Sequence, residues 1–99
     1  MNQPERTTLF YMANLGSEFV RVFNALDKNN ELAGRAAVQR CFGIIEKLKG
    51  LEEMKSRSEE TDRLIDILND FLLETPNYSI SRSQIENYFN PFALRLTKV

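Results

Sequence analysis

Carboxylates that recur at helical spacing are the residues of this chain with the clearest potential for chemistry. Four of them follow one another at intervals of three and four residues: Glu59, Asp62, Asp66 and Asp70. This spacing places them along one side of a helix, and divalent cations prefer such oxygen ligands. The same pattern is typical of the solvent-exposed face of an amphipathic helix. We expect this acidic ridge to be ordinary helix surface, with metal binding and docking to a basic partner as alternatives.

Histidine and paired cysteines, which most catalytic and metal-binding sites use, are missing from the sequence. The absence of histidine removes the commonest general base and the commonest nitrogen ligand. The single cysteine, Cys41, cannot form an internal disulfide or a cysteine-based zinc site, and its helical neighbours Ala37 and Leu48 predict a buried thiol. We therefore expect no enzymatic activity, no cofactor and no small-molecule substrate. A metal-dependent hydrolase built on the acidic ridge is the remaining enzymatic alternative.

Length and composition predict one globular domain over residues 1–99. Hydrophobic residues make up 42% of the chain and charged residues 27%, which is ordinary for a folded protein. No stretch approaches the roughly 20 apolar residues that span a bilayer, and the first residues lack the apolar segment of a secretory signal. We expect a soluble, cytoplasmic protein with no membrane contact.

The charge balance argues against nucleic acid as a partner. The net charge is −1, so no overall field attracts a polyanion. Arg21, Arg35 and Arg40 could form a basic patch in the first half of the chain. Glu18 and Glu31, however, precede Arg21 and Arg35 by three and four residues, the spacing of helix-stabilising ion pairs. We expect these arginines to support helices rather than to bind nucleic acid.

The first half of the chain predicts two helices joined by a tight hairpin. Apolar residues recur at spacings of three and four over residues 7–26 and again over 31–48. Asn30 is placed to cap the second helix, and Gly50 to end it. Gly16 weakens the first helix unless a neighbouring helix needs the space, and close packing is the reason we expect.

The third helix is predicted from a capping-box pattern, in which Ser56 and Glu59 would bond each other's backbone at the helix start. Pro76 ends it, because proline cannot continue the backbone hydrogen bonding. Residues 51–58 before it could form an extra turn of helix or an exposed loop.

A short fourth helix begins within residues 81–86, where two capping boxes overlap, one ending at Gln84 and one at Glu86. Asn90 and Pro91 either end it or cap a last turn. Short connections favour neighbouring helices that run antiparallel. The fold class we predict is all-α, an up-down-up-down four-helix bundle.

Aromatic side chains near the two ends of the chain are what a simple monomeric bundle explains least. Residues 9–12 are apolar on every side of a helix, so one core cannot bury all of them. The C-terminal helix could cover them within the chain. Alternatively, five aromatic residues form an interface with a second copy or another protein: Phe10, Tyr11, Tyr78, Tyr88 and Phe92.

These observations favour a non-catalytic domain that acts through protein–protein interaction or self-association. A homodimer is the most concrete form, because twofold dimers are the commonest soluble oligomers and a small domain gains burial from one. The alternative is a helical accessory subunit that binds a nucleotide, a nucleic-acid substrate or a partner enzyme.

Overall fold

The computed structural model describes residues 4–72 and 81–97 of the chain. Helices account for nearly all of them, in the order α1 (Pro4–Asp27), α2 (Glu31–Lys49), the 3-10 helix η1 (Glu52–Arg57), α3 (Ser58–Phe71) and α4 (Arg82–Thr97). No strand occurs within these two ranges. The all-α prediction is therefore confirmed.

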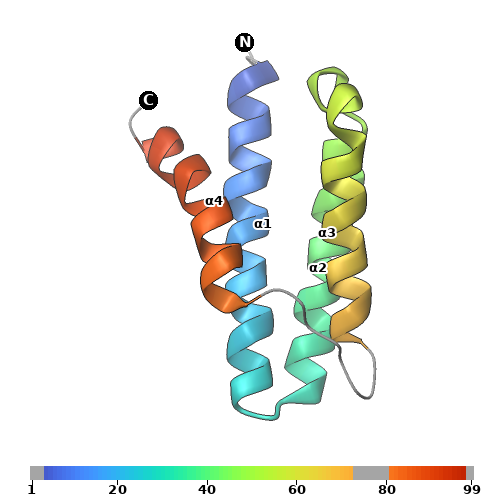
Figure 1. Ribbon diagram of the computed structural model, residues 1–99, viewed down its shortest axis with the longest axis vertical. Helices are drawn as coiled ribbons and strands as arrows, with labels where there is room; N and C mark the ends of the chain where they lie inside the picture. The colour runs from blue at the N-terminus through green and yellow to red at the C-terminus, as the bar shows by residue number, and fades with distance from the viewer. Residues whose placement is uncertain (1–3, 73–80, 98–99) are drawn as a thin grey trace.

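Helix α1 is the central element of the bundle. It packs against α2 on one side and α4 on the other, while α3 packs mainly on α2 (Figure 1). Successive helices run in opposite directions, so the N-terminal end of α1 and the C-terminal end of α4 lie at the same end of the molecule (Figure 1). The predicted up-down-up-down topology is confirmed, and α4, with 16 residues, is shorter than α1 with 24 and α2 with 19.

The core lies between the helices along the length of α1. Its fully buried side chains come from every element of the first three quarters of the chain: Met12, Leu15, Phe19, Cys41, Ile45, Leu48, Met54 and Leu68. Cys41 is buried as predicted, and burial, together with the nearby Glu18 carboxylate, raises the pKa of its thiol to about 12.

The hairpin between α1 and α2 forms as the sequence predicts. The Asn30 side chain accepts a hydrogen bond of 3.1 Å from the Ala33 backbone N–H and so caps α2. Asn29 adopts the left-handed conformation that the turn requires, with a φ of 52°. Gly50 ends α2 in right-handed geometry, where its N–H reaches the Lys47 carbonyl at 3.2 Å.

The segment after α2 is η1, which settles the question left open for residues 51–58. Met54 is the buried apolar anchor of this turn. The capping box predicted for Ser56 and Glu59 is wrong, because η1 continues through Arg57 and leaves Ser56 inside a helical turn. An N-cap residue needs non-helical backbone. Helix α3 starts at Ser58 with no side-chain cap.

Helix α4 begins with the first of the two predicted capping boxes. The Ser81 N–H donates to Gln84 Oε1 at 2.7 Å, and the Gln84 N–H donates to Ser81 Oγ at 3.2 Å. The helix does not end at Asn90 and Pro91 but continues to Thr97 with Pro91 inside it. Helix α3 ends at Phe71, earlier than the end predicted at residues 75–77, which themselves lie outside the described residues.

Helix α4 is fixed on α1 at two places. At the middle, a Cβ on Gly16 would stand 2.8 Å from the Phe89 Cβ, so only glycine allows this approach, as predicted. At the first residue of α4, Arg82 donates to Asn24 at 3.0 Å and to Asp27 at 3.2 Å. The Gly16 contact sets the separation of the two helices.

Alanine substitutions at Gly16 and Gly43 should change stability in opposite directions. A Cβ at Gly43 meets no atom within 4 Å, so Gly43→Ala should raise the free energy of unfolding by roughly 0.5–1 kcal/mol through helix propensity. Gly16→Ala should lower it by about 1 kcal/mol, because overpacking against Phe89 outweighs the same gain. Urea denaturation followed by far-UV circular dichroism measures both. Equal stabilisation by the two substitutions would contradict the close approach of α4.

Candidate functional site

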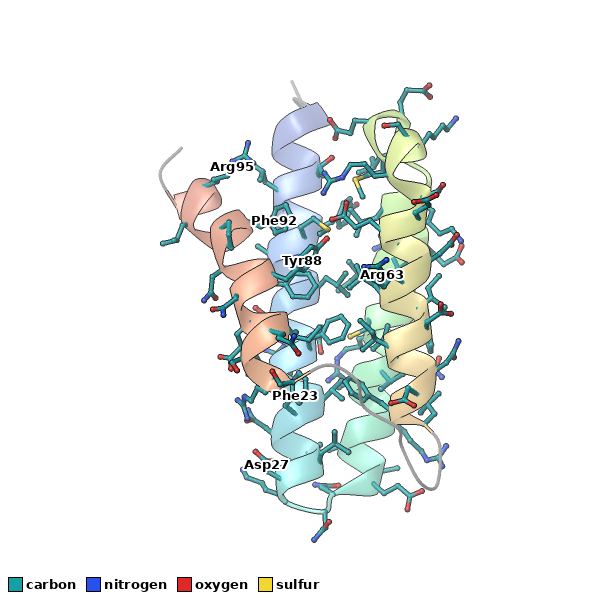
Figure 2. All side chains as sticks on the ribbon, viewed as in Figure 1. Phe23, Asp27, Arg63, Tyr88, Phe92 and Arg95 are labelled. Atoms are coloured by element: carbon teal, nitrogen blue, oxygen red, sulfur yellow. The ribbon has the colours of Figure 1, made fainter. Side chains whose placement is uncertain are left out.

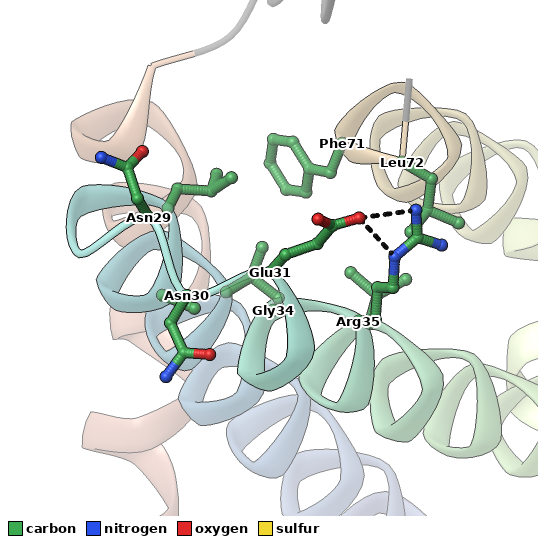
Figure 3. A pocket seen from close by; sticks show the side chains of 11 residues that line it. Asn29, Asn30, Glu31, Gly34, Arg35, Phe71 and Leu72 are labelled. Carbon is green, nitrogen blue, oxygen red and sulfur yellow. Dashed lines mark hydrogen bonds and ion pairs between the residues drawn. The ribbon is translucent and has the colours of Figure 1, made fainter. Parts of the chain in front are cut away.

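An end pocket of about 500 Å³ lies between the α1–α2 hairpin and the end of α3 (Figure 3). Its walls are mostly apolar, with contributions from three helices: Val22, Ala25, Leu26, Val38, Phe71 and Leu72. Gly34 leaves part of the space open, because it presents no side chain there. Pockets that hold ligands or partner side chains have volumes of this order.

Three of the four polar residues that line the end pocket make side-chain hydrogen bonds within the chain. Glu31 accepts from Arg35 Nε at 3.1 Å across the mouth, as the predicted helix pair (Figure 3). Asn30 is used as the cap of α2. Within the described residues, no buried side-chain nitrogen or oxygen lacks a hydrogen bond. The pocket therefore has mostly apolar walls and a polar rim in which Asn30, Glu31 and Arg35 are already hydrogen-bonded.

The end pocket was not predicted from the sequence. Its residues come from the hairpin and from the last turn of α3, which are far apart in sequence. The available signal was the small side chain at Ala25 beside Gly34, where an added Cβ would stand 3.5 Å from the Ala25 Cβ. Small residues facing each other can indicate either close packing or a hollow, and the sequence does not distinguish them.

The structure describes four of the five predicted interface aromatics. Phe10 points outward with 51% of its surface exposed. Tyr11 is half-buried, with the Lys47 ammonium 6.0 Å from its ring centre. Tyr88 and Phe92 are half-buried on α4, with ring centres 5.7 Å apart, and extend over α1 (Figure 2). Tyr78 lies outside the described residues. Phe10 is thus the most accessible of the four.

The acidic ridge lies on the outer side of α3. Glu59, Asp62 and Asp66 are exposed and Asp70 is half-buried. Lys49 Nζ is 3.8 Å from an Asp62 oxygen. Among the side chains that the structure describes, no three carboxylates, histidines or cysteines converge to hold a metal ion.

The arginines of α1 and α2 contact carboxylates. Glu18 accepts from both Arg21 and Arg40 at 2.9 Å, and only the first of these pairs was predicted. The second joins α1 to α2 through residues that are far apart in sequence. Because each of these guanidinium groups already has a carboxylate partner, their attraction for an anion is reduced.

A polar cluster joins α4 to η1 and α3. Arg57 donates two hydrogen bonds of 2.8 Å to the Glu60 carboxylate, which also accepts from the Tyr88 hydroxyl. Burial and the bond to Glu60 raise the pKa of Tyr88. Burial alone would raise the pKa of Glu60, but the hydrogen bonds from Arg57 and Tyr88 outweigh it and the pKa is lowered.

A comparison with known protein families, with curated proteins and with solved structures found no match for this chain. Of the helices in residues 4–72 and 81–97, none combines the length and apolar character that crossing a bilayer requires. The function therefore has to be inferred from the chain's own geometry.

The cluster around Glu60 should make stability sensitive to acid. A carboxyl whose pKa is lowered from 4.5 stabilises the fold above that pH, and the contribution is lost as the pH falls below it. In Glu60→Gln, which cannot titrate, the free energy of unfolding should fall less steeply between about pH 5 and about pH 3. Urea denaturation at stepped pH measures the slopes. Glu59→Gln, at an exposed neighbour, should keep the wild-type slope. Identical slopes for Glu60→Gln and the wild type would rule out this linkage.

Proposed function

We propose that this chain is a non-catalytic interaction domain that binds another protein at its end pocket. The observation that carries the proposal is the hollow of about 500 Å³, apolar inside and charged at its rim, between α1, α2 and α3. Protein interfaces combine a desolvated apolar centre with a polar rim in the same way. The pocket has the volume to receive apolar side chains projecting from a partner's helix or turn.

A small-molecule ligand is less well supported by the same pocket. Sites for small molecules place a few polar groups inside the cavity to orient the ligand. Here Glu31 and Arg35 bond each other at the mouth, and the side chains lining the interior are aliphatic or aromatic. Burying apolar surface in such a pocket stabilises binding, but it gives little selectivity for one metabolite over another.

Leucine at Gly34 should block partner binding, whereas leucine at Gly43 should not. Gly34 lines the pocket, and an added Cβ there meets only Ala25 at 3.5 Å, so the larger side chain can extend into the hollow. Gly43 lies exposed on the same helix with no atom near its would-be Cβ. Quantitative affinity capture from cell extract should recover at least one protein with the wild type and Gly43→Leu and lose it with Gly34→Leu.

Two outcomes of that comparison would contradict the proposal. If the three variants capture the same proteins in the same amounts, the pocket is not the docking site. If native mass spectrometry shows a small molecule retained by the wild type and by Gly43→Leu but absent from Gly34→Leu, the pocket holds a ligand instead. Circular dichroism confirms that each variant remains helical.

We propose self-association as a second mode of interaction, supported by the outward position of Phe10. Exposed aromatic side chains are enriched at protein interfaces, and a small domain gains burial by pairing. A dimer would have about 23 kDa, twice the 11.5 kDa of the chain. Sedimentation velocity over a range of concentrations measures this mass, and a constant monomer mass would remove this second mode without affecting the first.

A further inference from the structure

We infer that two copies of the chain pair by inserting Phe10 of each into a hollow between α1 and α4 of the other. This inference rests on the self-association proposed above and identifies the residues that would be in contact. Phe10 is half exposed on α1, and its described ring neighbour is Tyr11, whose centre lies 6.0 Å away. A single exposed aromatic residue is common on protein surfaces and indicates nothing alone. The hollow is the second observation.

The hollow is a shallow groove of about 140 Å³ between α1 and α4. Small residues of α1 and α4 keep it open, among them Ala13, Ser17 and Ala93, and Phe89 and Ile85 form part of its lining. For comparison, an engineered apolar cavity of about 150 Å³ in another protein binds benzene. One phenylalanine ring therefore matches the volume.

Two of the three polar side chains that line the hollow, Ser17 and Glu86, already have partners within their own chain, and the third is the exposed Asn90. The Ser17 hydroxyl donates to the Ala13 carbonyl at 3.3 Å. The Glu86 carboxylate is 3.3 Å from Arg82 Nε. An aromatic ring entering the hollow thus displaces water from apolar surface and leaves no new buried charge unpaired.

Phe10 and the hollow lie on one face of the same helix. Ala13 and Ser17 follow Phe10 by three and seven residues, so all three side chains project from the same side of α1. Seven residues of helix span about 10 Å. If two α1 helices pack antiparallel, with the twofold axis midway between Phe10 and Ser17, each Phe10 faces Ser17 of the other copy.

This arrangement identifies the occupant as a second copy of the chain. Both hollows are filled at once, so the contact closes as a dimer instead of continuing into a fibre. Such a dimer needs a protruding ring, here called the knob, and a hollow to receive it, here called the hole. Phe10 is the knob and the hollow between α1 and α4 is the hole, and both lie on one surface. An unrelated partner would need only the hole. Asn14 and Asn90, both exposed beside the contact, would form its polar rim.

Two variants separate the knob from the hole. Phe10→Ser removes the ring, and Ser17→Phe fills the hollow of its own chain; both change exposed positions, so helicity should be retained. Either variant alone should weaken dimerisation at least about tenfold, because the burial of the Phe10 ring is then lost at both symmetric contacts of the dimer. Mixing them should restore a heterodimer, in which the Phe10 ring of one variant enters the open hollow of the other. Leu32→Ser, at a residue 83% exposed on α2, is the control and should keep the wild-type dimer.

Sedimentation velocity measures the mass of the wild type, of each single variant and of the equimolar mixture, and so tests this contact. Loss of dimer in both variants with recovery in the mixture is the expected result. If Ser17→Phe dimerises like the wild type while Phe10→Ser does not, Phe10 packs elsewhere, and self-association stands while this contact is overturned. If the mixture stays monomeric, the hole assignment is overturned. A wild type that is monomeric at every concentration overturns both.

Discussion

Phe19 of α1 makes the contact on which the arrangement of the other helices depends. Its buried ring lies 6.3 Å from Phe71 of α3 and 5.3 Å from Phe89 of α4, measured between ring centres. Among the described residues, α3 and α4 do not pack directly on each other as helices. They are held through this aromatic group and through the hydrogen bond from Tyr88 to Glu60. The bundle is thus organised around one helix.

Both candidate surfaces follow from that organisation. Since α1 contacts α2 and α4 on its two flanks, its outward side stays uncovered and exposes Phe10. Since α3 lies on α2 and reaches α1 only through side chains, the residues that the structure describes leave space at the hairpin end of the bundle, and the end pocket forms there. Neither surface requires a special sequence motif, and both come from incomplete coverage of a four-helix arrangement.

The sequence correctly predicted those helix caps that depend only on interactions between residues close together in the chain. The caps at Asn30 and Ser81 depend on hydrogen bonds within one turn, and both predictions are confirmed. The cap at Ser56 failed because a buried Met54 holds the preceding residues in a helical turn, which is a tertiary effect. Aromatic periodicity likewise could not show that Tyr88 and Phe92 pack within the chain while Phe10 faces outward, since exposure depends on which helix covers which flank.

Because Cys41 is buried, the reactivity of its thiol reports the opening of the core. The thiol is buried in the shared core of the bundle, and its raised pKa keeps it protonated at neutral pH. Alkylating reagents attack the thiolate, so they react only when the helices separate and the thiol meets water. Because the chain has no other cysteine, the rate of labelling reports how often the core opens around Cys41 of α2.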